Sequence, residues 1–221
     1  MLRFHSLRNA SPQILLGLCV LTLFSLCGQS TPQNQQQQSL SESKADTCDN
    51  PDADINCNFI NIPRNISNIL TIADPREPGE RMIISGTIYK ADGKTPYSNV
   101  ILYAYHTDDK GVYSKKGNET GIQKWHGRLH GWLKTDSKGY YEIRSIRPAR
   151  YPGNRIMAHI HAAIKPVDGQ PFYINDYVFK DDSLVNEQYL SRLTNIGGTG
   201  VVDIKKEGNI WRGKRDIVIK N

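Results

Sequence analysis

The feature that most constrains the fold is a series of short segments in which apolar and polar residues alternate. Two of them, residues 82–89 and 100–105, are separated by the turn sequence ADGKTP. The stretch GWLKTDSKGYYEIRSI repeats the arrangement around the turn DSKG. A period of two places the apolar side chains on one face of a β-strand. Further short strands are predicted in the stretches HIHAAIKP, FYINDYVF, VVDIKKEG and RDIVIKN.

Helical periodicity is almost absent, and DDSLVNEQYLSRL is the one stretch predicted to form a short helix. Short strands joined by turns rich in Gly, Asp and Lys are typical of an antiparallel β-sandwich. We therefore predict an all-β fold, an antiparallel β-sandwich with long loops and little helix. It is expected to form a single domain over residues 79–221.

The N-terminal residues have a different character. The basic start MLRFHSLRNASPQ precedes the apolar run ILLGLCVLTLFSL, which has the length of a signal-peptide core and is short for a membrane span. We predict a signal peptide over residues 1–26 and a disordered, Gln-rich tether over residues 27–47. Cys27 resembles the lipid-modified cysteine of bacterial lipoproteins, although Leu26 stands where a small residue is usual. The chain is thus expected to be exported to the cell envelope and lipid-anchored at Cys27; a simply cleaved signal, giving a periplasmic or secreted protein, is the alternative.

Residues 48–78 are predicted to form an irregular lead-in rich in Pro and Asn. The two cysteines of this segment, Cys48 and Cys57, favour a small loop disulfide in an oxidising compartment. A metal-binding pair is the weaker interpretation, because no second Cys or His pair lies near them in the sequence.

The charge pattern gives little support to nucleic-acid binding. The formal net charge of +6 comes from 28 Lys and Arg against 22 Asp and Glu, and the excess is spread along the chain. A nucleic-acid footprint usually gathers its basic residues on one face. We therefore expect no nucleic-acid partner.

Two histidines one residue apart, His159 and His161, lie in the predicted strand RIMAHIHAAI. Residues i and i+2 of a strand point to the same side, so both imidazoles can reach one ion. The alternative is a pair of packed histidines without a ligand. No carboxylate follows at a suitable spacing, so further donors would come from elsewhere, and the loop residues Tyr113 and Tyr151 are the candidates.

The order of these motifs resembles the intradiol ring-cleavage dioxygenases. The resemblance is carried by GTIYKADGKTPYSNVILYAYHTDDKGVY, then GRLHGWLKTDSKGYYEIRSIRPARYP, AHIH and YVFKDD, over roughly residues 79–185. It implies a ferric ion, Fe(III), held by Tyr113, Tyr151, His159 and His161. It also implies that a catechol-type aromatic diol and O₂ react to a cis,cis-muconate-type dicarboxylic acid, with Tyr151 leaving the iron to act as a base.

Two positions depart from the pattern of that family. An Arg three residues before the first His is usual, and this chain has Ile156 there, so either Arg155, one position earlier, takes the charge-stabilising role or that role is missing. Asp176 stands where the family commonly has Gln. Two alternatives therefore stay open: a non-catalytic β-sandwich of the transthyretin or carboxypeptidase-regulatory kind, and an iron-binding family member with weak activity.

Three further histidines receive other interpretations. His126 and His130 are four residues apart, but the glycines around them argue against a helix, so loop or pocket-lining roles are predicted rather than a metal pair. His106 lies beside a turn and is predicted to be exposed.

Overall fold

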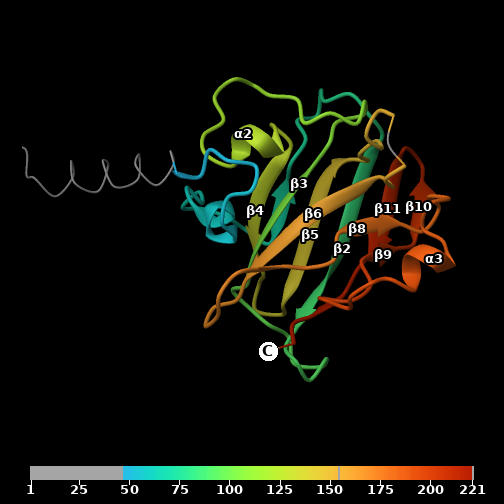
Figure 1. Cartoon of the computed structure of the whole chain (residues 1–221). Helices are drawn as coiled ribbons and strands as arrows, with labels where there is room; N and C mark the ends of the chain where they lie inside the picture. The colour runs from blue at the N-terminus through green and yellow to red at the C-terminus, as the bar shows by residue number, and fades with distance from the viewer. Residues whose placement is uncertain (1–46, 154, 221) are drawn as a thin grey trace, which may run out of the picture.

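Two six-stranded β-sheets pack face to face in the computed structural model, which describes residues 47–153 and 155–220 (Figure 1). The first sheet has the order β1 (Ile69–Thr71), β5 (Tyr140–Ile146), β2 (Arg81–Tyr89), β11 (Ile210–Lys214) and β10 (Ile204–Glu207), and β12 (Ile217–Val218) also pairs with β2. The second has the order β4 (His130–Lys134), β3 (Ile101–His106), β6 (His159–Lys165), β8 (Tyr177–Phe179) and β9 (Val201–Val202), and β7 (Phe172–Tyr173) also pairs with β6. The predicted all-β sandwich is confirmed.

The strand directions differ from the prediction at the edges of the sheets. The central pairs β2/β5, β3/β4 and β3/β6 are antiparallel, as expected. The pairs β1/β5, β2/β11, β2/β12 and β8/β9 are parallel, so both sheets are mixed. Parallel strands are joined by long connections, so a prediction based on strands that are adjacent in the sequence does not reveal them.

The segment predicted as the strand FYINDYVF divides into β7 and β8. Ile174 still donates its backbone N–H to the Ala162 carbonyl of β6, but the Asn175 N–H turns to the Ile196 carbonyl. The chain therefore leaves β6 for a few residues and returns to it at Tyr177.

Alternation along the strands sorts side chains between the core and the outer face of each sheet. Every second residue of β2 is buried. On β3 the alternation places Leu102 and Ala104 in the core, where they join Ile160 and Ala162 of β6. Burial of each large apolar side chain contributes roughly 1.5 to 3 kcal/mol. Residues of the opposite parity on β3 and β6 consequently lie on the outer face of the second sheet.

The predicted lead-in of residues 48–78 contains regular structure. It holds the 3₁₀ helix η1 (Ile55–Phe59) and strand β1, which joins the first sheet ahead of the predicted domain start at residue 79. A disulfide joins Cys48 to Cys57, which is the first of the two sequence interpretations. Phe59 packs on Tyr103, so the lead-in covers part of the outer face of the second sheet.

Two short helices complete the fold. Helix α2 (Gln123–His126) ends at Gly127, whose φ of 70° is the left-handed conformation that glycine adopts readily. Helix α3 (Glu187–Leu190) is the short helix expected near the C-terminal third, and the Asn186 side chain caps it by accepting from the Tyr189 N–H. No helix within residues 47–153 and 155–220 is long and apolar enough to cross a membrane. The predicted signal peptide, most of the tether and Cys27 lie outside the described residues.

His106 is buried, so the prediction that it is exposed is wrong. His106 lies two residues after Ala104 on β3, so its side chain points to the same, core-facing side of the strand as those of Leu102 and Ala104. Nδ1 donates to the Thr107 carbonyl at 2.7 Å, and Nε2 accepts from the Ser145 hydroxyl at 2.7 Å. Burial lowers the pKa of His106 to about 4.

This lowered pKa should make folding sensitive to acid. The unfolded chain takes up a proton on His106 below its ordinary pKa of about 6.5, whereas the folded chain resists until about 4. His106 thus contributes stability above pH 6.5 that is lost as the pH falls toward 4. We expect the loss of unfolding free energy between pH 7.5 and 4.5, measured by urea titration, to be about 2 to 3 kcal/mol smaller in His106→Gln than in the wild type. An equal loss in both proteins would contradict this assignment.

Candidate metal centre

Strand β6 places His159 and His161 side by side on the outer face of the second sheet. The residue between them, Ile160, points into the core with no exposed surface. The Nε2 atoms of the two imidazoles lie 3.0 Å apart. The strand geometry thus delivers the pair of nitrogen donors expected from the His-x-His spacing.

Outer hydrogen bonds fix which nitrogen of each ring faces the site. His159 Nδ1 donates to the Met157 carbonyl at 2.7 Å, and His161 Nδ1 donates to the Asp176 carboxylate at 3.0 Å. Both Nε2 atoms are therefore left as acceptors. Burial, followed by the neighbouring His161, lowers the pKa of His159 and keeps its ring neutral, which is the form that coordinates metals.

Tyr113 lies on the loop between β3 and α2, which hydrogen bonds and close backbone contacts hold in place. The Asp108 carboxylate accepts from the N–H groups of Lys110 and Val112 and from the Ser114 hydroxyl. Gly127 packs so closely on Tyr113 that an added Cβ would lie 2.8 Å from the Tyr113 carbonyl carbon. The position of Tyr113 is thus set from both sides of the loop.

Tyr151 lies on the connection between β5 and β6. The preceding Arg150 pairs with Asp182, whose carboxylate also accepts from the Ala158 N–H at 3.1 Å. The two residues after Tyr151, Pro152 and Gly153, are exposed. Anchors therefore hold both ends of this connection, while the residues immediately after Tyr151 face solvent.

The four predicted ligand side chains come together at one place. The Tyr151 hydroxyl lies 2.6 Å from the Tyr113 hydroxyl, 3.3 Å from His159 Nε2 and 3.5 Å from His161 Nε2. Ligands about 2.1 Å from one ion and about 90° to 110° apart are separated by roughly 3.0 to 3.4 Å, so the spacing of Tyr151 and the two histidines fits a shared cation, whereas the two phenols, hydrogen-bonded to each other, would move apart to bind it.

The electrostatics of the site also favour a cation. Burial raises the pKa values of Tyr113 and Tyr151 above the ordinary value for tyrosine, so both phenols are neutral at pH 7 in the protein alone. A highly charged metal ion offsets the cost of deprotonating two such phenols. Two phenolates and two neutral imidazoles suit a transition-metal ion better than Mg²⁺ or Ca²⁺, which prefer oxygen ligands.

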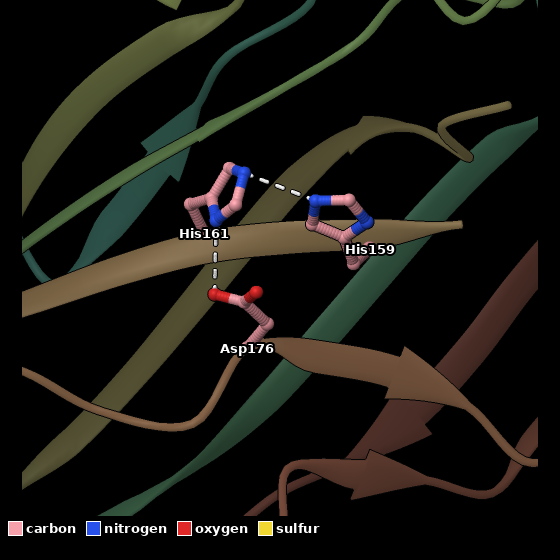
Figure 2. Close-up of side chains that lie close together, drawn as sticks. All are labelled: His159, His161 and Asp176. Atoms are coloured by element: carbon pink, nitrogen blue, oxygen red, sulfur yellow. Dashed lines mark hydrogen bonds and ion pairs between the residues drawn. The ribbon is translucent and has the colours of Figure 1, made fainter. Parts of the chain in front are cut away.

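Asp176 lies close enough to the two histidines to form a three-residue cluster (Figure 2). A set of two histidines and one carboxylate would also be a metal-binding pattern. However, Asp176 bonds to Nδ1 of His161, on the opposite edge of the ring from the Nε2 that faces His159 and Tyr151. The carboxylate thus lies behind His161, outside the group of four donors.

An aromatic wall that the sequence reasoning missed borders the donors. The Tyr105 ring stacks on His126, with 3.5 Å between ring centroids, and on His161 at 4.6 Å. Tyr105 lies directly across from His161 in the β3/β6 pairing, so the strand register was the signal that could have found it.

Of the two histidines His126 and His130, His130 has the expected lining role, whereas His126 lies in a short helix, which the neighbouring glycines had argued against. His126 lies at the end of α2, and its Nδ1 is 2.9 Å from the Tyr103 hydroxyl. Burial lowers the pKa of His126 to about 3, so this ring is neutral. His130 belongs to β4 and borders a neighbouring cavity of about 350 Å³ together with Trp132.

Arg155 is not tied to the four donors by a hydrogen bond or an ion pair within the described residues. Its side chain is exposed, and it forms no hydrogen bond or ion pair with the rest of the described chain. Ile156, at the position where the family has Arg, is 40% exposed. The charge-stabilising role of Arg155 stays a prediction.

Comparisons with known proteins agree with this fold. The profile of a family described as Dioxygenase matches residues 58–189. A curated relative, catechol 1,2-dioxygenase from Acinetobacter baylyi, is 30% identical over an alignment of 135 residues, and the match covers 48% of this chain and 42% of that protein. The chain thus spans less than half the length of this relative.

Solved structures share the fold. One is the dioxygenase domain of a dioxygenase carbohydrate-binding protein fusion from Streptomyces sp. SirexAA-E, with a TM-score of 0.54, 18% identity, and coverage of 72% of this chain and 92% of that one. Another is catechol 1,2-dioxygenase from Acinetobacter sp. ADP1 inhibited by bound mercury, with a TM-score of 0.51, 21% identity, and coverage of 71% and 59%. Because the family profile matches most of the sandwich, the chain belongs to the intradiol ring-cleavage dioxygenase family.

Proposed function

We propose that the protein is a non-haem Fe(III) enzyme that cleaves a catechol-type aromatic between its two hydroxyl-bearing carbons. One molecule of O₂ is consumed, both of its oxygen atoms enter the product, and the product is a cis,cis-muconate-type dicarboxylic acid. The observation that carries the proposal is the convergence of two tyrosine hydroxyls and two imidazole Nε2 atoms at one point.

The donor set supports ferric iron in particular. Tyr113 and Tyr151 provide hard, anionic oxygen ligands once deprotonated, and such ligands stabilise Fe(III) relative to Fe(II). His159 and His161 add neutral nitrogen ligands held in fixed tautomers. When bound, a ferric ion supplies Lewis acidity that gathers the two hydroxyls of a catechol and prepares its ring for reaction with O₂.

The two tyrosines are held differently, which supports different roles. The loop of Tyr113 is fixed by the Asp108 hydrogen bonds and by the close backbone contact at Gly127. Tyr151 is followed by two exposed residues, which leaves solvent-filled space beside that part of its loop. We assign to Tyr151 the acceptance of a proton from a catechol hydroxyl, and to Tyr113 a permanent ligand position.

Iron-loaded protein tests this proposal through its colour. Phenolates bound to Fe(III) give a visible charge-transfer band, so the protein should be red-brown, and anaerobic catechol should shift the band. Colour without a shift or without O₂ uptake would indicate an iron-binding member with little activity. Protein that stays colourless after iron loading would favour a non-catalytic sandwich and contradict the proposal.

We also propose export to the cell envelope, with lipid attachment at Cys27. The Cys48–Cys57 disulfide supports export, because such bonds persist in oxidising compartments. The mass of the mature chain is the test, since an unmodified N-terminus would exclude the anchor. The proposed partners are the aromatic diol and O₂.

A further inference from the structure

We propose that Asp176 is a positioning residue that fixes the His161 ring and places a negative charge behind it; this inference rests on the proposed function. The Asp176 Oδ1 accepts from His161 Nδ1 at 3.0 Å, while His161 Nε2 faces His159 (Figure 2). The same Nε2 lies 3.5 Å from the Tyr151 hydroxyl. A carboxylate bonded to the outer nitrogen of a ligating imidazole sets its tautomer and orientation and raises its basicity.

Strand register puts Asp176 in this place. His159 lies across from Val178, and Ile160 across from Tyr177, in the antiparallel β6/β8 pair. Continued by one residue, the β6/β8 register sets Asp176 across from His161, whereas the β6/β7 register, continued the other way, would set Asn175 there. The shift of one residue between β7 and β8 thus favours Asp176 as the neighbour of His161, and the 3.0 Å hydrogen bond joins the two side chains.

The backbone around Asp176 is held on both sides. Gly200 approaches it so closely that an added Cβ would lie 2.1 Å from the Asp176 carbonyl oxygen. The buried Arg215 donates from Nη2 to the Asn175 carbonyl at 2.8 Å, and its guanidinium carbon lies 4.0 Å from the centroid of the Tyr177 ring. The carboxylate is thus presented from a fixed frame.

The two imidazoles consequently differ in their outer partners. His159 donates to a neutral carbonyl, that of Met157, whereas His161 donates to a carboxylate. A ferric ion with two phenolates carries one net positive charge, and Asp176 offsets that charge from behind His161. We therefore expect Asp176 to strengthen retention of Fe(III) in preference to Fe(II).

Two replacements separate the hydrogen bond from the charge. Asp176→Asn keeps an oxygen that accepts from His161 Nδ1 but removes the charge. Asp176→Leu removes both. With iron supplied as the ferric nitrilotriacetate chelate, the affinity should fall by about 10- to 100-fold in Asp176→Leu and by less than about 10-fold in Asp176→Asn. The Fe(III)/Fe(II) reduction potential should move to more positive values in both.

The exposed Asp168, in the turn after β6, gives the matched control, because Asp168→Asn removes one charge away from the donors. Wild-type affinity and potential in Asp176→Leu would overturn the positioning role. If that variant does not fold, an unchanged potential in Asp176→Asn overturns the role by itself. A loss above about 1,000-fold in Asp176→Asn would mean that Asp176 binds the ion directly, because such a loss exceeds the effect of an outer partner.

The wild-type protein separates this inference from the proposed function. Wild-type protein that takes up no ferric iron would overturn both. Iron-loaded, active wild-type protein with unaffected variants would overturn the inference alone.

Discussion

Replacing Tyr113 with Phe should remove ring cleavage and lower the affinity for Fe(III) by at least about 100-fold, since even outer partners of metal ligands contribute 10- to 100-fold. The change deletes one hydroxyl and leaves the ring, which packs near Tyr105 and Tyr151. The hydrogen bond lost to Tyr151 contributes only about 1 kcal/mol to stability, so the variant should fold. Iron titration and O₂ uptake with catechol measure the two effects.

Tyr140→Phe is the matched control for this variant. The Tyr140 hydroxyl donates to Glu142 on β5, in the sheet that does not carry the donors. This variant should keep wild-type iron affinity and O₂ uptake. Equal behaviour of the Tyr113 and Tyr140 variants would exclude Tyr113 as a ligand.

Gly111→Ala should lower the free energy of unfolding by about 2 to 5 kcal/mol, the sum of a left-handed conformation forced on Ala and an overpacked contact. Gly111 has φ of 77°, and an added Cβ would lie 1.9 Å from the Arg150 carbonyl oxygen. Because Gly111 and Arg150 precede Tyr113 and Tyr151 closely in sequence, the methyl group should also push the two phenols apart. We therefore expect the folded fraction of the Gly111→Ala variant to bind iron more weakly than the wild type.

Gly117→Ala separates these two causes. Gly117 lies in the same loop with φ of 96°, but no atom lies within 4 Å of a Cβ added there. Urea unfolding should show a loss of only about 1 to 2 kcal/mol, the conformational cost alone, with iron binding unchanged. Equal losses in the two variants would contradict the close contact between the tyrosine loops.

Much of the fold could be predicted because alternation is a local signal. The runs around 82–89 and 100–105 became β2 and β3, and the sandwich follows from the apolar face that each strand must bury. Strands β1 and β11 lay outside the predicted strands, and the parallel pairing of the predicted strand β12 could not be foreseen, because the partners of these strands lie far away in the sequence. The prediction for His106 is wrong for a related reason: its position beside a turn suggested exposure, whereas its ring lies on the core-facing side of β3 and is buried.

Some residues of the candidate site could likewise be predicted from the sequence, and others could not. The His159 and His161 spacing and the family resemblance pointed to four side chains, and the structure brings these four together. Tyr105 of β3 and Asp176, which immediately precedes β8, lie beside His161 because of the way these strands pair with β6, and no local pattern in the sequence contains that pairing. In the sequence Asp176 stands out only as a departure from the family, and in the structure its carboxylate is hydrogen-bonded to His161.

The position of ring cleavage tests the central claim most directly. Iron-loaded wild-type protein, given catechol and ¹⁸O₂, should produce a cis,cis-muconate-type diacid with one labelled oxygen in each carboxyl group. Tyr113→Phe, treated in the same way, should produce almost none. A product opened beside the two hydroxyl-bearing carbons, or wild-type protein that binds iron and catechol but forms no ring-opened product, would contradict the claim.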